Sequence, residues 1–202
     1  MSAHTAAPVG RPRDPGVDDK ILHAAVGLFG DAGWAGFTFD EIARRASVGK
    51  AAIYRRWSSK DELLMDALSR HLNVVEDADT GSLRGDLVGI AGQLLESYLG
   101  DAGRAFMRLK VESDAAEAIG ARYSAWSESQ MRAARATVRR GIERGELDPG
   151  APTTLIIDTV CGGAVNHASA TPPHLIGKVR RGAKEYVEDL VDFVLAAVPR
   201  HD

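Results

Sequence analysis

The stretch 38–60 constrains the fold of this chain more than any other, because it predicts two short helices separated by a tight turn. Thr38 is a favourable helix N-cap, and Glu41 three residues later completes the pattern of a capping box. We expect this first helix to end near Ser47, with the next two residues, Val-Gly, in the turn. A second helix should then begin at Lys50.

The second predicted helix has an apolar face and a basic face. Ile53 and Trp57 are four residues apart, so they share the face that we expect to pack inward. The other face has small and basic side chains, a surface that can lie close to base edges in a DNA major groove. We interpret the stretch as a helix-turn-helix. The predicted DNA contacts are Thr38, Arg44, Gly49, Lys50, Ala51, Ala52, Tyr54, Arg55, Arg56 and Lys60.

A solvated surface is the alternative interpretation, because a run of basic residues on a helix usually faces water. Here the cap, the turn, the small exposed residues and the Tyr-Arg-Arg-Trp run occur together and in order, which favours DNA reading. Within this site we expect Lys50 to contact bases, with Arg55 as the alternative. Tyr54 and Lys60 are expected to contact phosphates, which are the same at every base pair.

Residues 37–43, 46–57 and 59–63 resemble the N-terminal signature of the tetracycline-repressor (TetR) family of bacterial transcriptional regulators. The chain has Ser47 where many members have Gly, and Gly49 where many have Ser. The resemblance covers about a quarter of the chain. It implies an all-α protein, in which a three-helix DNA-binding domain precedes a helical domain for ligand binding and dimerisation.

Helical periodicity continues through the rest of the chain and gives a domain prediction. We expect a flexible tail over residues 1–16, a DNA-binding domain over 17–62, and a regulatory and dimerisation domain over 63–202. A connecting helix at about 60–76 should join the two domains. Two arginines in the tail suggest an alternative role for it, as an arm in the DNA minor groove.

The last two predicted helices are our candidates for a homodimer interface. The first starts at Pro152 and is nearly apolar all round, and the second runs from about Lys178 to Val198. Palindromic double-stranded DNA requires a two-fold protein, and the resemblance places the interface in these helices. We expect the stripe Val187–Val194 to form it.

The family usually has a ligand pocket in its helical body, so the resemblance implies a small-molecule effector there. Apolar and aromatic side chains of the body could line such a pocket, although core packing explains them equally well. His167 could also line the pocket, but it could instead be a buried or interfacial histidine whose hydrogen bonds are satisfied. The candidate pocket residues are Phe106, Leu109, Tyr123, Trp126, Gln130, Val160, Ala164 and His167.

Charge and composition narrow the choice of function. Residues 1–60 have nine Lys/Arg against six Asp/Glu, whereas the whole chain has a net charge of −3, so the basic character is confined to one end. The sequence has no metal-binding His pattern, no phosphate-binding glycine loop and no apolar stretch long enough to span a membrane. Cys161 is the only cysteine, which fits a reducing cytoplasm. We expect a cytoplasmic protein that is not an enzyme and uses no metal or cofactor.

The sequence therefore predicts a sequence-specific DNA-binding transcriptional regulator, a repressor that a small-molecule effector releases from its operator. Two alternatives stay open. One is a helix-turn-helix regulator without a small-molecule effector, and the other is a helical ligand-binding or enzymatic bundle in which the basic helix has no role.

Overall fold

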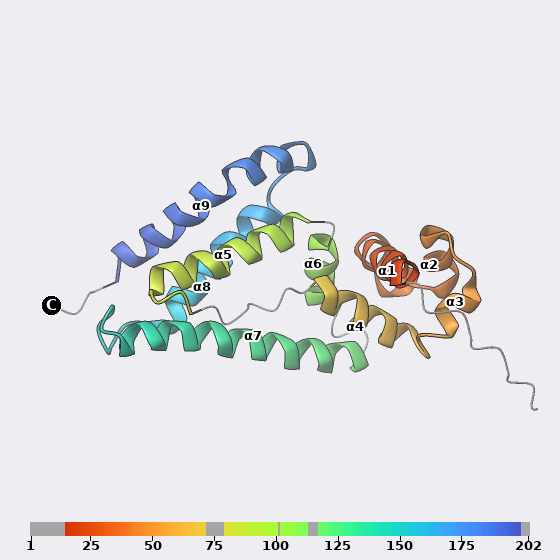
Figure 1. Ribbon diagram of the computed structural model, residues 1–202, viewed down its shortest axis with the longest axis horizontal. Coiled ribbons are helices and arrows are strands. Elements are labelled where there is room, and N and C mark those ends of the chain that lie inside the picture. The colour runs from red at the N-terminus through yellow and green to blue at the C-terminus, as the bar shows by residue number, and fades with distance from the viewer. Residues whose placement is uncertain (1–14, 72–78, 101, 113–116, 199–202) are drawn as a thin grey trace, which may run out of the picture.

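The computed structural model describes residues 15–71, 79–100, 102–112 and 117–198. Regular structure within these ranges is helical, without a strand, which confirms the all-α prediction. A small head lies at one end of the molecule and a larger helical body at the other (Figure 1). The predicted tail lies outside the described residues, except that residues 15 and 16 already belong to the first helix.

The head contains α1 (Pro15–Gly36), α2 (Phe39–Ala46) and α3 (Lys50–Tyr54), and α4 (Lys60–His71) leads from it to the body. The apolar spacing that begins near Val17 predicts a first helix that ends at the boundary of Ala32 and Gly33. The helix is instead kinked there, with Gly33 at φ 65°, and it continues for three more residues. A positive φ is favourable only for glycine, so this residue sets the position of the kink.

In the described residues the body is built from four long helices, with a one-turn 3-10 helix, η2 (Pro173–Leu175), before the last of them. The long helices are α5 (Leu83–Leu99), α7 (Glu117–Glu143), α8 (Thr153–Ser169) and α9 (Ile176–Ala196). Helix α5 contacts α7, α8 and α9 and is therefore central to the body. The short α6 (Gly103–Glu112) lies between the body and α1 (Figure 1).

The buried apolar side chains form two cores, and the division does not follow the chain. The first core contains the apolar faces of α1 to α4 together with Phe106 and Leu109 of α6. The second core is made by α5, α7, α8 and α9. Tyr98, at the end of α5, packs against both. Because α6 follows a body helix but packs with the head, a movement of α6 would act directly on the head.

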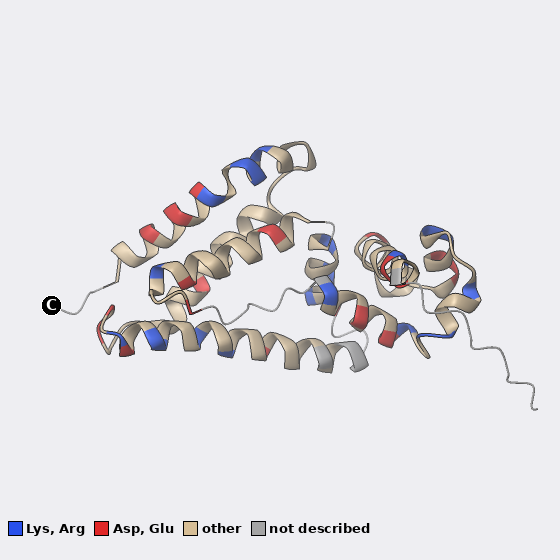
Figure 2. Ribbon diagram, in the orientation of Figure 1, with Lys and Arg blue, Asp and Glu red and all other residues tan. Residues whose placement is uncertain are grey.

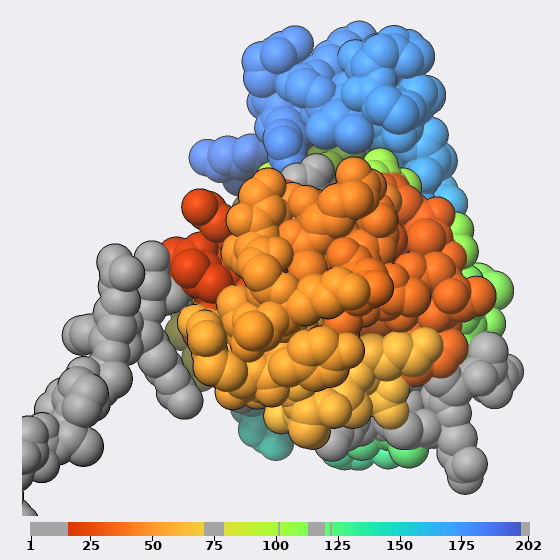
Figure 3. All heavy atoms as spheres, turned by 90° about the vertical axis from the view of Figure 1, so that its right-hand side faces the viewer, coloured from red at the N-terminus to blue at the C-terminus, as the bar shows by residue number. Residues whose placement is uncertain are grey.

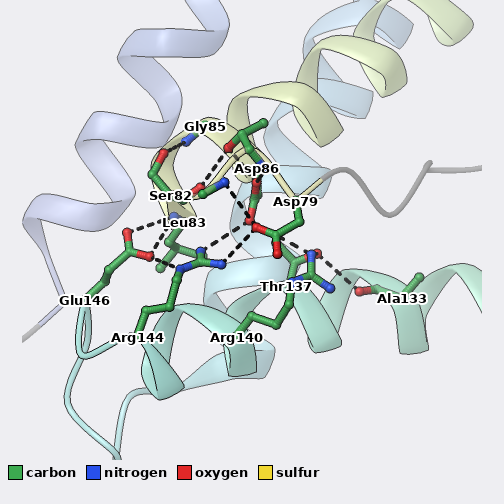
Figure 4. A network of polar contacts seen from close by, with 12 residues as sticks. Asp79, Ser82, Leu83, Gly85, Asp86, Ala133, Thr137, Arg140, Arg144 and Glu146 are labelled. Carbon is green, nitrogen blue, oxygen red and sulfur yellow. Dashed lines mark hydrogen bonds and ion pairs between the residues drawn. The ribbon is translucent and has the colours of Figure 1, made fainter.

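A group of polar side chains, which we name the Asp86 cluster, ties the start of α5 to the end of α7 (Figure 4). Asp86 Oδ1 accepts hydrogen bonds from the N–H and the hydroxyl of Thr80, both at 2.6 Å, and Oδ2 lies 3.4 Å from Arg144 Nη2. Glu146 accepts from the backbone N–H of Leu83 at 2.8 Å and from Arg144 Nε at 2.6 Å. The cluster satisfies both a helix start and a buried carboxylate.

Candidate nucleic-acid interface

Helix α2 and its cap form the first half of the helix-turn-helix. Thr38 Oγ1 accepts a hydrogen bond from the backbone N–H of Glu41 at 3.3 Å, as the sequence predicts. The capping box is only half formed, because the Glu41 carboxylate accepts from Arg44 at 2.5 Å and from Arg45 at 3.2 Å instead of turning back to the cap. These hydrogen bonds lower the pKa of Glu41 to about 2. A DNA phosphate would therefore compete with Glu41 for Arg44.

The turn closes in spite of the serine and glycine that depart from the family pattern. Ser47 has φ 55° and ψ 44°, a left-handed conformation that costs a residue other than glycine roughly 1–2 kcal/mol. Val48 N–H donates to the carbonyl of Ala43 at 3.0 Å, which ends α2. Gly49 precedes α3 in an extended conformation and offers no side-chain cap. The turn thus survives, while α3 begins without a side-chain acceptor.

The sequence predicts a second helix over residues 50–57, but α3 ends at Tyr54 because the chain turns at residues 55 and 56. Its inner face is as predicted, since Ile53 and Trp57 are both buried in the first core. Trp57 Nε1 also donates to Asp66 Oδ2 of α4 at 3.0 Å. These contacts fix the rotation of α3 about its axis, and so decide which side chains point outward.

The outward side of α3 presents Lys50, Ala51, Tyr54 and Arg55, while Ala52 is half-buried. Lys50 Nζ lies 2.6 Å from Asp40 Oδ1, and the Tyr54 ring stands edge-on to Phe39 with 5.0 Å between ring centroids. Helices α2 and α3 together cover much of the end face of the head (Figure 3). Basic residues of α2 and of the segment after α3 lie at this end of the ribbon (Figure 2).

Two predicted DNA contacts have partners inside the head. Arg56 forms an ion pair with Asp18 of α1 and donates to the carbonyl of Ala52 at 2.9 Å, and its side chain is only 14% exposed. Arg56 therefore holds α1 against α3 instead of facing outward with Arg55. Lys60 is at the start of α4 as expected, but its Nζ lies 3.8 Å from the centroid of the Trp34 ring.

We name the outward side of α3, with Lys50, Ala51, Tyr54 and Arg55, the reading face. Sequence reasoning missed the residues that hold this face in place. Phe39 supports Tyr54 and Asp40 pairs with Lys50, while Trp34 underlies Lys60. Each pair is at least ten residues apart and belongs to two different helices. The three- and four-residue spacings that reveal contacts within one helix give no signal for such pairs.

The predicted ligand-pocket residues are divided among four environments. Phe106 and Leu109 are buried in the first core, and Val160 and Ala164 in the second. His167 stacks on Tyr186, with 3.9 Å between ring centroids. The others, Tyr123, Trp126 and Gln130, are half-buried on α7. Tyr123 and Trp126 pack against the first core with their rings 5.9 Å apart.

The part of the chain that the structure describes gives little support for a metal site or a reactive cysteine. There, no group of three or more His, Cys, Asp or Glu side chains is placed to hold a metal ion. Burial, together with the nearby Asp158, raises the pKa of the Cys161 thiol to about 11, so this thiol is protonated at neutral pH and is a poor nucleophile. No described helix combines the length and the hydropathy needed to cross a membrane.

Solved structures with this fold include MexZ of Pseudomonas aeruginosa, described as a key repressor responsible for antibiotic resistance. It is 19% identical in sequence with a TM-score of 0.73, over 92% of this chain and 96% of MexZ. This likeness concerns the fold alone.

Sequence comparison gives the family. The profile for bacterial regulatory proteins of the tetR family matches residues 21–67, and a tetracyclin repressor-like C-terminal domain matches 77–194. The HTH-type transcriptional regulator YdeS of Bacillus subtilis is 33% identical over 76% of this chain and 78% of its own length. The regulator AqdR of Rhodococcus erythropolis is 33% identical over 71% of this chain and 70% of its own. The chain, whose head carries a helix-turn-helix with a basic outward face, belongs to the TetR family of transcriptional regulators.

Proposed function

We propose that this protein is a homodimeric repressor in the cytoplasm, which binds a palindromic operator with α3 in the major groove and leaves it when an effector binds the body. The observation that carries the proposal is the orientation of α3, whose buried Ile53 and Trp57 force Lys50, Ala51 and Arg55 outward at the end of the molecule. The DNA-binding transcriptional repressor TetR of Mycobacteroides abscessus, which is 44% identical over 37% of this chain, supports repression. The proposed domains are residues 17–62 for DNA and 63–202 for regulation.

Lys50 is the proposed specificity residue. It starts α3, where recognition helices meet base edges, and a lysine can donate to guanine O6 and N7. Ala51 and Ala52 are small enough to admit thymine methyl groups beside it. Its ion pair with Asp40 is exposed on both sides, so DNA can replace Asp40 as its partner at little cost.

Phosphate contacts are proposed for the residues around this reading face, whose side chains carry a single hydroxyl or a positive charge. They are Thr38, Arg44, Tyr54 and Lys60, with Arg55 serving either bases or phosphates. Gly49 lets the backbone come close to DNA. Arg56 is left out of the proposed set because it is committed to Asp18.

Titration against the operator and against scrambled DNA over a salt series tests this division of roles. A gel shift on the DNA flanking the protein's own gene would first locate the operator. Lys50→Ala should then lose roughly 1–3 kcal/mol of binding free energy, mainly on the operator. Lys60→Ala should weaken binding to all DNA alike and lower the salt slope by about one unit per half-site. Arg132→Ala, on the exposed side of α7, is the control. An equal loss on both DNAs for Lys50→Ala would show that Lys50 contacts phosphate.

Dimerisation through α8 and α9 is proposed to use a different face from the predicted stripe. Val187, Val191 and Val194 are buried in the second core of the same chain, so the expectation that they form the interface is wrong for these three. Phe193 of α9 is 75% exposed, and Leu155 of α8 is also exposed. Large apolar side chains on a protein surface favour contact with a second protein chain, and we assign both to the interface.

Light scattering at micromolar concentration tests the interface. Wild type should have the mass of two chains, and Phe193→Asp should shift the population to single chains without a loss of helicity. Phe193→Leu is the matched control and should remain dimeric. Wild type with the mass of one chain would contradict the homodimer, and with it the palindromic operator.

The effector is proposed to bind next to α7, beside the half-buried Tyr123, Trp126 and Gln130. Trp126 Nε1 is buried and has no hydrogen-bond acceptor among the described residues, so it could donate to a ligand. Its indole also reports directly on binding. The contribution of Trp126 to the fluorescence is the part of the signal that the Trp126→Phe variant lacks. If an apolar or cationic compound releases the protein from operator DNA, this contribution should change when the compound binds. Unchanged fluorescence with an active compound would place the effector elsewhere.

A further inference from the structure

A surface cleft of about 690 Å³ lies where α6 meets both α1 and the end of the body, away from the reading face of α3. Its walls come from α1, the end of α5, α6 and the segment that joins α8 to α9. None of the eight predicted pocket residues lines it. The residues that matter here are Tyr98, Arg104, Met107, Arg108, Val111 and Ile176.

The cleft exposes apolar side chains of α6 to solvent. Val111 is 78% exposed and Met107 is also exposed, although both are large apolar residues. Half-buried Tyr98 and Ile176 extend this apolar lining toward the body. Covering such a surface is favourable because it removes apolar area from water.

Two arginines make the same cleft positive. Among the described residues, Arg104 and Arg108 line it against a single acidic residue, Glu112. The Glu112 carboxylate already accepts hydrogen bonds from the Trp34 N–H at 2.8 Å and from Arg108 at 3.0 Å. The lining therefore combines an apolar surface with an excess of positive charge.

Both guanidinium groups keep donors for a ligand. Each has five N–H donors, and among the described residues Arg104 uses only Nη2, which donates to Asp31 Oδ1 at 3.0 Å. Arg108 uses Nη1 for Glu112 and Nη2 for the carbonyl of Asp31, the latter at 3.4 Å. Arg104 is 70% exposed, so an incoming anion can reach it.

We propose that this cleft binds a small amphipathic anion, with its apolar part on Met107, Val111 and Ile176 and its acid group on Arg104 and Arg108. The volume lies within the range of about 300–1,000 Å³ that is usual for small-molecule sites. A carboxylate matches the planar fork of a guanidinium, which favours an acid over a neutral head group. The site is separate from the effector site proposed next to Trp126.

Binding here would act on the support of the helix-turn-helix. Asp31 holds Arg104 of α6 and also Arg45 of α2, the latter at 2.8 Å. An acid group on Arg104 competes with Asp31, and so weakens the link between α6 and the head. This regulatory consequence rests on the proposed function, whereas binding of the anion does not.

Calorimetric titration of the full-length protein with decanoate tests the binding, and decanol of the same chain length serves as the neutral probe. Decanoate should bind wild type about tenfold more tightly than decanol, because only the acid engages the arginines. Arg104→Gln should remove most of that difference, and Val111→Asp should weaken both probes. Arg132→Gln, an exposed arginine of α7 with its own acidic partner, should change neither.

Three results would overturn the inference. The first is that decanoate does not bind at concentrations up to about 1 mM, and the second is that neither Arg104→Gln nor Val111→Asp changes its binding. The third is that Val111→Asp converts a dimer to single chains in light scattering, which would mean that a second copy covers the cleft. Operator titration with decanoate then tests the regulatory consequence alone. If decanoate binds at the cleft but leaves DNA affinity unchanged, the site stands and its link to the head is wrong.

Discussion

Two groups of ion pairs join helices that are distant in the sequence, and they differ mainly in burial. In the Asp86 cluster the Asp86 side chain is 0% exposed. In the second group, which we name the Asp31 cluster, Asp31 pairs with Arg45 and Arg104 at 2.8 and 3.0 Å, but all three side chains are substantially exposed. Similar distances thus occur in very different surroundings.

The difference in burial predicts that the two clusters have different structural roles. Removing one partner of a buried pair leaves a charge without its counterpart, whereas exposed pairs contribute only about 0–1 kcal/mol because water and salt screen them. The Asp86 cluster therefore fixes the geometry of the body. The Asp31 cluster joins α6 to the head through contacts that can be exchanged for other partners, which suits the part of a regulator that must move.

The largest effect is expected from Asp86→Ala. The variant leaves Arg144 and the Thr80 N–H without their buried acceptor. We expect a loss of roughly 3 kcal/mol in the free energy of unfolding, the low end of what breaking a buried ion pair usually costs. The low end applies because Arg144 keeps its contacts with Glu146 and Asp79. Urea denaturation measures it. Asp79→Ala removes an exposed partner of the same arginine and is the control. Equal losses in the two variants would remove the distinction between the clusters.

The contribution of Asp86 should also depend on pH. Burial raises the pKa of this carboxyl, but hydrogen bonds from Thr80 and Arg144 outweigh it and hold the pKa below its ordinary value of 3.8. Ionised Asp86 therefore stabilises the fold above pH 3.8, and the contribution is lost as pH falls from there through the pKa of the folded state. The stability difference between wild type and Asp86→Asn should narrow over this acid range. A difference independent of pH would contradict the ionic role.

An intermediate effect is expected at the contact between α6 and the kink of α1. The Glu112 carboxylate accepts the Trp34 N–H at 2.8 Å, next to the kink at Gly33. Glu112→Ala leaves this part-buried donor without an acceptor and should cost about 1–2 kcal/mol, with faster hydrogen exchange at the Trp34 amide. Glu112→Gln keeps an acceptor and should recover most of the protection. If both variants exchange like wild type, the contact does not anchor the head.

The smallest effect is expected from Asp31→Ala, at no more than about 1 kcal/mol in the free energy of unfolding at low ionic strength. At about 1 M salt the difference from wild type should vanish, because the screening length falls to roughly 3 Å. Thermal unfolding at both ionic strengths measures this. A larger loss that persists at high salt would make the Asp31 cluster a structural anchor like the Asp86 cluster.

The sequence by itself determined the elements that depend on local patterns. The cap at Thr38, the turn at Ser47, the inward positions of Ile53 and Trp57 and the helical body all follow from spacings of three or four residues and from turn chemistry. The family follows too, since its signature is carried by this same contiguous stretch. These features require knowledge of only a few neighbouring residues at a time.

Only the tertiary structure decided which helices pack together and which charges meet. It assigned Arg56 to Asp18 instead of the reading face, buried Val187 and Val191 within the chain, and joined α6 to the core of the head. It also placed Asp86 beside Arg144. Each of these contacts joins segments that local patterns do not connect, and the local spacing of a sequence does not specify which face of one helix meets another part of the chain.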